Sequence, residues 1–169
     1  MPRTRKAPAR QNGHMEVSAK VDYGMRALLE LTQAYRADPL ALRKTDAIAV
    51  AQEIPAKFLE GILGQLRLNG LVISQRGADG GFRLARAPDK ITVADVVRAL
   101  DGPLAAVRGM APEEANYYGA SEHLRDVWIA TRSAVRAVME NVSLADIAEG
   151  GLPREVAPFL EEPGAWKRR

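Results

Sequence analysis

Apolar residues recur at three- and four-residue steps near the start of the chain, and this spacing predicts amphipathic helices. The first helix is expected over 19–35, with Ser18 as its N-terminal cap. The second is a short helix over 45–52, which Thr45 or Asp46 is expected to cap. Each helix turns one apolar face inward, so the two are expected to share a core.

A third helix is expected directly after the second, over 56–69. Ile54-Pro55 separates the two, because the residue before a proline avoids helical backbone, and Asn69-Gly70 ends the third helix. Its apolar positions, with Phe58 among them, predict a buried face. Two helices joined by a tight turn, with another helix before them, make a helix-turn-helix.

A short β-hairpin is expected after the third helix. Strands over 72–75 and 82–85 flank a glycine-rich tip that carries Asp79-Gly80, a pair that favours tight turns. The arginines on or beside this hairpin are Arg76, Arg83 and Arg86. A basic hairpin that follows a helix-turn-helix is a wing. The predicted fold class is therefore mainly α with a small β-hairpin, and a winged helix-turn-helix domain is expected over 16–90.

The stretch 91–150 is expected to add a long dimerisation helix to this domain. The expected elements are a linker helix over 93–100, a loop over 102–120, a long helix over 121–141 and a short helix over 144–148, followed by a partly ordered tail over 151–169. The apolar stripe of the long helix consists of Leu124, Val127, Trp128, Thr131, Val135, Val138, Met139 and Val142. Such a stripe predicts a homodimer interface, because DNA-binding regulators are usually two-fold. Packing against the chain's own domain is the alternative for part of it.

Positive charge is concentrated in the N-terminal half of the chain. Residues 16–90 carry 11 Lys or Arg against 9 Asp or Glu, whereas residues 91–153 carry 5 against 9. This asymmetry places a polyanionic partner, double-stranded DNA, on the N-terminal half. Residues 1–15 are expected to form a disordered basic arm, which either contacts DNA phosphates or is a solvated tail.

The composition excludes several classes of protein. The chain has no cysteine, which excludes disulfides, thiolate zinc sites and cysteine-ligated iron–sulfur clusters. No apolar run approaches the roughly 20 residues of a membrane span. The basic start of the chain is not a secretory signal, so a cytoplasmic protein is expected. The sequence has no nucleophile elbow, His-x-x-x-His pair or phosphate-binding loop, so no enzyme is expected.

The third helix is the candidate for contact with base edges, because the major groove of DNA admits an α-helix. Its residues expected to face DNA are Ala56, Lys57, Glu60 and Gly61. Lys57 can donate to guanine or to phosphate, and Glu60 can accept from a cytosine amino group. The alternative is that Glu60 is a solvated residue paired with Lys57.

The wing and the first helix supply the other candidate DNA contacts. Gly77, Gly80 and Gly81 are expected to permit positive φ and close approach to phosphate. Arg76 and Arg83 are expected to reach a minor groove. The remaining candidates for phosphate contact are Lys20, Tyr23, Arg26 and Arg67. Packing of Tyr23 in the core and a surface ion pair of Arg67 are the alternatives.

The ordered set of these segments resembles the Rrf-type family of bacterial winged helix-turn-helix transcriptional regulators. The segments that carry the resemblance are Ser18-Ala19-Lys20, Arg26-Ala27-Leu28, Phe58-Leu59-Glu60, Asn69-Gly70-Leu71-Val72, Arg76-Gly77, Gly80-Gly81-Phe82-Arg83-Leu84-Ala85, Ile91-Thr92-Val93-Ala94-Asp95-Val96, Gly102-Pro103-Leu104 and Ser143-Leu144-Ala145-Asp146. The resemblance implies a sequence-specific DNA-binding regulator. We expect a repressor that acts as a homodimer on a palindromic operator.

The loop before the long helix departs from the family pattern. Cluster-binding members are similar to one another in carrying three cysteines there, whereas this chain has Gly109 and Glu122 at the outer positions. No cofactor and no metal are therefore expected. A metal site on His123 with Glu122 or Glu114 is the disfavoured alternative, because these residues form no recognisable ligand spacing. Glu53 also stands where the family commonly has a glycine in the turn between the second and third helices.

The signal to which such a regulator responds stays open in the sequence. One possibility is a pocket for a small-molecule or protein effector, lined by Met110, Tyr117, Tyr118, His123 and Trp128. The alternative is that these residues only pack the loop onto the long helix. A competing hypothesis for the whole chain is a protein-interaction or effector-sensing module of the same fold with weak or lost DNA binding.

Overall fold

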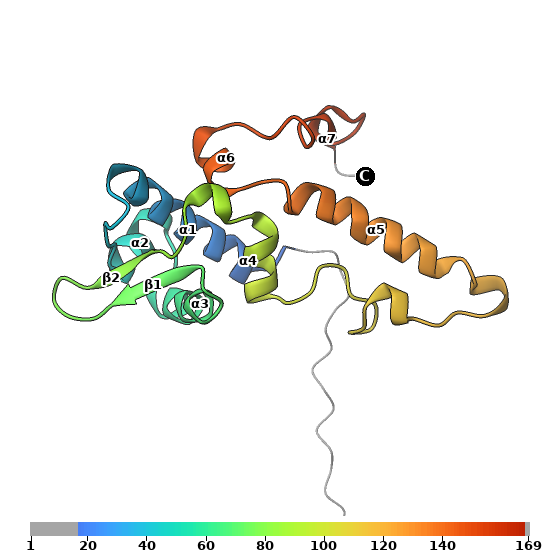
Figure 1. Ribbon diagram of the computed structural model, residues 1–169, viewed down its shortest axis with the longest axis horizontal. Helices are drawn as coiled ribbons and strands as arrows, with labels where there is room; N and C mark the ends of the chain where they lie inside the picture. Colours follow the sequence, from blue (N-terminus) through green and yellow to red (C-terminus); the bar gives the residue numbers. More distant parts are fainter. Residues whose placement is uncertain (1–16, 168–169) are drawn as a thin grey trace, which may run out of the picture.

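The computed structural model describes residues 17–167, which form helices and one two-stranded antiparallel sheet (Figure 1). The elements are α1 (Ala19–Ala37), α2 (Thr45–Gln52), α3 (Ala56–Leu68), β1 (Val72–Gln75), β2 (Gly81–Leu84), η1 (Pro88–Lys90), α4 (Val93–Leu100), η2 (Pro112–Glu114), η3 (Gly119–Ser121), α5 (Leu124–Met139), α6 (Leu144–Glu149) and α7 (Pro158–Glu161). The predicted basic arm (1–15) lies outside the described residues.

Helix α1 lies at the centre of the core and contacts α2, α3, α4, α6 and β2. The predicted cap is confirmed, because the Ser18 side chain accepts a hydrogen bond from the Val21 backbone N–H at 3.1 Å. A Cβ atom at Gly24 would lie 2.5 Å from Cδ1 of Leu100. The glycine therefore lets α4 approach α1 closely, and fully buried Leu28 and Leu31 fill the space along the rest of the helix.

Helices α2 and α3 form the predicted helix-turn-helix. The turn between them depends on Glu53, which has a left-handed backbone at φ 52°. The predicted cap of α2 is wrong: the N-cap is Lys44, and no side chain caps the helix. The prediction that Phe58 is buried is also wrong, because its side chain is 51% exposed and packs only edge-on against the Tyr23 ring, 5.9 Å between centroids.

The wing is the hairpin β1–β2, paired from Val72↔Leu84 to Gln75↔Gly81. Its second strand begins one residue earlier than predicted. Gly81 belongs to the strand because it pairs with Gln75. A third backbone segment joins the hairpin, since Arg43 and Phe82 exchange backbone hydrogen bonds of 2.8 and 2.9 Å. The base of the wing is thereby tied to the residues before α2.

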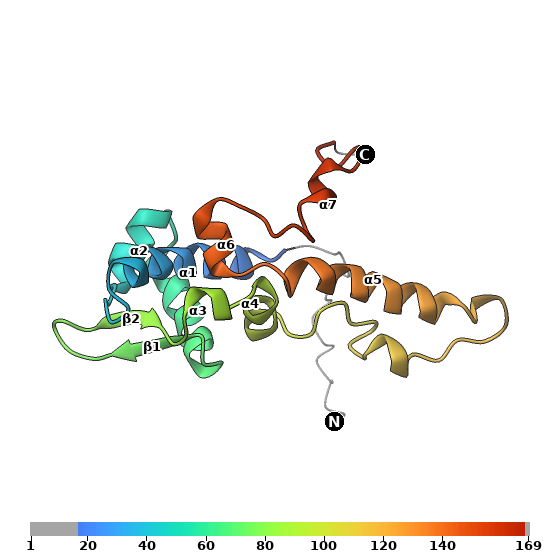
Figure 2. The ribbon, with the colours of Figure 1, turned by 45° about the horizontal axis from the view of Figure 1, so that its top comes forward.

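The loop after α4 runs away from this head, and helix α5 returns alongside it toward the head (Figures 1 and 2). The helix is shorter than the predicted 121–141, because Ser121 belongs to the separate turn η3 and Glu140 is the C-terminal cap. None of the residues of α5 is buried in the described chain.

Val142, predicted as part of the exposed stripe, instead belongs to the core. It lies after the end of α5 and is only 4% exposed. Its carbonyl accepts from the Val93 backbone N–H at 2.9 Å, beside the bridge that joins Thr92 to Ser143. Both of those residues carry a capping box, as their sequence positions before a helix predict.

Candidate nucleic-acid interface

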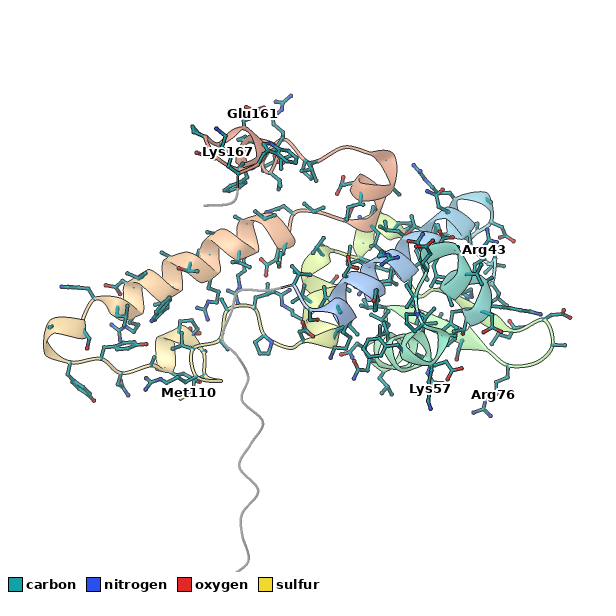
Figure 3. All side chains as sticks on the ribbon, turned by 180° about the vertical axis from the view of Figure 1, so that it is seen from behind. Arg43, Lys57, Arg76, Met110, Glu161 and Lys167 are labelled. Atoms are coloured by element: carbon teal, nitrogen blue, oxygen red, sulfur yellow. The ribbon has the colours of Figure 1, made fainter. Side chains whose placement is uncertain are left out.

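The four residues of α3 predicted to face DNA, Ala56, Lys57, Glu60 and Gly61, are all exposed. They share the outer face of the helix because Leu59, Ile62, Leu63 and Leu66 hold the opposite face in the core. Figure 3 shows Lys57 on the same edge of the head as Arg76 of the wing. This face is therefore available to a partner.

Two glycines of α3 have no packing role within the described residues 17–167. A Cβ atom at Gly61 or at Gly64 would meet nothing within 4 Å. Glycine inside an exposed helix costs about 1 kcal/mol relative to alanine. The outer face of α3 therefore lacks side chains at these two positions, at the cost of helix stability.

A groove of about 600 Å³ separates the start of α2, the outer face of α3 and the wing. It brings together five predicted site residues: Glu60, Arg76, Gly77, Gly80 and Gly81. It also contains Lys44 and Thr45, which were not predicted as site residues. The sequence offered no signal for them, because a capped helix was expected here, whereas the structure shows no side-chain cap and so leaves N–H groups free for an anion.

Positive φ is expected at all three wing glycines, but the structure has it at only one of them. Gly77 has φ 110°, whereas Gly80 and Gly81 are not among the residues of positive φ. They are needed for lack of space: a Cβ atom would lie 2.3 Å from the Gln75 carbonyl oxygen at Gly80, and 2.5 Å from the Arg43 carbonyl oxygen at Gly81. These two glycines fix the shape of the wing rather than its flexibility.

Arg83 and Arg67 lie outside the groove. Arg83 pairs with Ile73 in the hairpin and is half-buried. Because neighbouring positions of a strand face opposite sides, Arg83 points away from the side that carries Phe82. Arg67 is exposed near the end of α3, with its guanidinium 3.5 Å from the Ser74 hydroxyl. The structure thus gives the wing one arginine in the groove and one on the other face.

The three candidates on α1 have partners inside the chain. Lys20 donates to the Leu100 carbonyl, and its ammonium lies 3.5 Å from Asp101. Arg26 lies over the Tyr23 ring at 5.4 Å and donates to the Gln52 carbonyl. These contacts tie α1 to α4 and to the end of α2, so the residues have a structural role whether or not they also contact phosphate.

The five residues predicted to line one effector pocket are not brought together. Tyr118 is 82% exposed, and the His123 side chain is 90% exposed. Trp128 lines a cavity of about 490 Å³ beside α4, and Met110 lines a different one of about 460 Å³. The cause is that the loop turns back at the Val107–Met110 bridge, which separates its two halves.

Residues 17–167 contain neither a candidate metal site nor a candidate membrane span. Within that range, no three His, Cys, Asp or Glu side chains are grouped so that they could hold a metal ion. No helix of the same range is long and apolar enough to cross a membrane.

The profile of the Rrf2 family, described as "Iron-dependent Transcriptional regulator", matches residues 17–150. The chain belongs to the Rrf2 family. An HTH-type transcriptional regulator of Mycobacterium tuberculosis is 44% identical over 148 residues, which are 88% of this chain and 90% of that protein. The HTH-type transcriptional regulator CymR of Bacillus subtilis is 35% identical over 134 residues, 79% of this chain and 90% of that protein.

Solved structures of the family share the fold. The structure of CymR, the global cysteine regulator of B. subtilis, superposes with a TM-score of 0.67 at 31% identity and covers 81% of this chain and 98% of that one. The match confirms the predicted winged-helix fold, and the family and its relatives are transcriptional regulators rather than enzymes.

The word iron in the family description does not fit the residues of this chain. Iron–sulfur clusters in proteins are held chiefly by cysteine thiolates, and this chain has none. At the outer family positions, Gly109 offers no side-chain ligand and Glu122 is exposed. A cysteine-held iron–sulfur cluster is therefore no part of the function proposed for this chain.

Proposed function

We propose that this Rrf2-family regulator binds double-stranded DNA sequence-specifically as a homodimer, with α3 in the major groove and the wing against a neighbouring minor groove. The observation that carries the proposal is the exposed face of α3 with its two glycines. Gly61 and Gly64 reduce helix stability and serve no packing within the chain. Their role is explained if another molecule approaches the backbone of this face closely, since a glycine has no side chain in the way.

The charges around the groove support DNA as that molecule. Lys44, Lys57 and Arg76 offer cations on or beside the groove, against the carboxylates of Asp46 and Glu60. The cations can neutralise phosphates, and the flexible stems of lysine and arginine let them follow the DNA backbone. A carboxylate facing a polyanion weakens non-specific binding, so Glu60 favours a role in selecting bases.

The exposed stripe of α5 supports a homodimer. Leu124 is 37% and Val127 is 52% exposed, and residues 17–167 bury no residue of this helix. The indole N–H of Trp128 is buried and has no hydrogen-bond partner within residues 17–167, whereas buried donors in proteins are nearly always paired. A second copy packed along α5 would cover the stripe. The interface residues that remain from the prediction are Leu124, Val127, Trp128, Thr131, Val135, Val138 and Met139.

A two-fold dimer would place two α3 helices in successive major grooves of a palindromic operator, about 10 base pairs apart. Binding across a promoter would block polymerase, so the proposed outcome is repression of transcription. The proposed location of the protein is the cytoplasm. The absence of cysteine means that the signal that releases DNA is not a cysteine-held cluster.

Random-site selection with the purified full chain tests this proposal. We expect enrichment of an inverted repeat with half-sites spaced by about one helical turn. The same selection with Glu60→Ala should recover a repeat that differs at one symmetric position, because the variant lacks the acceptor for a cytosine amino group. Recovery of no sequence above the starting pool would overturn the proposal.

A further inference from the structure

A second cavity, of about 460 Å³, lies between the end of α4, the following loop and α5, remote from the DNA-binding groove. Its volume lies within the range of small-molecule sites in proteins, about 300–1,000 Å³. Three guanidinium groups line it: Arg98 from α4, and Arg132 and Arg136 from α5. Met110 of the loop also lines this cavity, and Figure 3 shows where this residue lies.

The charges at this cavity do not balance. Arg132 lies 2.6 Å from the Glu113 carboxylate. Arg98 and Arg136 both pair with the single carboxylate of Glu140, which lies 3.7 Å from Nε of Arg136. Glu113 is the only acid among the described residues that line the cavity. With Glu140, which pairs with two of the arginines from outside the lining, two carboxylates stand against three cations.

The most recessed of the three cations is Arg132, whose side chain is only 15% exposed. A buried guanidinium is stable only when its donors are occupied, and a guanidinium has five of them. Glu113 stays ionised beside it: hydrogen bonds from its own backbone N–H and from Arg132 hold the pKa of this carboxyl below its usual value. The single carboxylate of Glu113 cannot occupy all five donors of Arg132, so N–H groups of this lining residue remain for a ligand.

The backbone of the loop is strained at the cavity wall. Ala105, which lines the cavity, and Arg108 both have a left-handed backbone at φ 53°. Non-glycine residues of this kind cost about 1–3 kcal/mol each and gather at ligand-binding and switch segments. The Val107–Met110 bridge, with backbone bonds of 2.9 and 3.0 Å, holds the strained turn in place.

We propose that this cavity binds a small organic anion through Arg98, Arg132 and Arg136. The shared chemistry is a carboxylate or a phosphate group, because either presents two oxygens to the planar fork of a guanidinium. A ligand on these residues would join α4 to α5. Since α4 packs on both α1 and α3, the bound anion would fix the DNA-binding head relative to the proposed dimer helix.

Isothermal titration of the full chain with sodium phosphate and, separately, with sodium citrate tests the proposal. Ionic strength and pH are held constant with sodium chloride, and no DNA is present, so the outcome is independent of the DNA-binding proposal. We expect saturable binding of at least one probe. Phosphate alone would indicate a phosphate-bearing ligand, and citrate alone would indicate a carboxylate.

Variants decide whether the binding belongs to this cavity. Arg136→Gln and Arg98→Gln, both at half-exposed positions, are expected to weaken binding at least tenfold, and Arg132→Gln to abolish it. Arg125→Gln is the matched control, because Arg125 is on α5 and does not line the cavity. Absence of saturable binding, or equal loss in the Arg125→Gln variant, would overturn the proposal.

Discussion

Replacing Gly61 and Gly64 of α3 by alanine should raise stability and lower DNA affinity at the same time. The added methyl groups meet nothing within 4 Å inside the chain, so they introduce no clash in the free protein. Each substitution removes a helix-interior glycine, which is worth about 0.8–1.0 kcal/mol. The double variant should therefore be more stable by about 2 kcal/mol.

On DNA, the same methyl groups would fill space at a close contact. Overpacking a fitted interface typically costs about 1–3 kcal/mol, which corresponds to a loss of roughly five- to 150-fold in affinity. Urea unfolding at one fixed protein concentration measures the first effect. Fluorescence anisotropy on the duplex recovered by selection measures the second.

Gly151→Ala is the matched control for this experiment. Its Cβ atom also meets nothing within 4 Å, and it follows α6, away from α3. Its DNA affinity should equal that of the wild type. If the Gly61→Ala and Gly64→Ala variants gain stability and bind the duplex as tightly as the control, the outer face of α3 is not the DNA interface.

Four further substitutions separate the parts of the wing and the turn. Arg76→Ala should weaken binding to all duplexes and lower the salt slope by about 1, whereas Arg83→Ala, outside the groove, should do so less; equal effects would contradict the groove assignment. Gly81→Ala should lower the free energy of unfolding in urea by about 1–3 kcal/mol, because the added Cβ would break the two backbone hydrogen bonds between Phe82 and Arg43. Glu53→Gly should gain up to about 1 kcal/mol by relieving the left-handed backbone, and a loss would show that the side chain stabilises the turn.

Periodicity and capping were sufficient to predict most of the fold. The helix-turn-helix and the wing follow from local signals, namely the Ile54-Pro55 break and the glycine-rich tip. The caps of α1, α4 and α6 follow from Ser18, Thr92 and Ser143 in the same way. Each of these signals acts within a few residues, which is why one sequence was enough to find it.

The features that the sequence did not predict depend on contacts between distant segments. The pairing of Arg43 with Phe82 ties the wing to the residues before α2, and no local sequence pattern predicts it. The ion pair of Lys20 with Asp101 could not be predicted from the sequence, because the two residues lie 81 positions apart in the chain. The cavity of three arginines was missed for the same reason, since Arg98 is separated from the other two by the whole loop.

Photo-crosslinking tests the central claim most directly. A benzophenone amino acid is placed singly at Lys57 on α3, at Arg76 on the wing and at Glu161 on α7, which lies at the opposite edge of the molecule (Figure 3). Each variant is irradiated with the labelled operator duplex at equal occupancy. The proposed interface predicts crosslinks from Lys57 and Arg76 and none from Glu161. Crosslinks from Glu161 without any from α3 or the wing would contradict it.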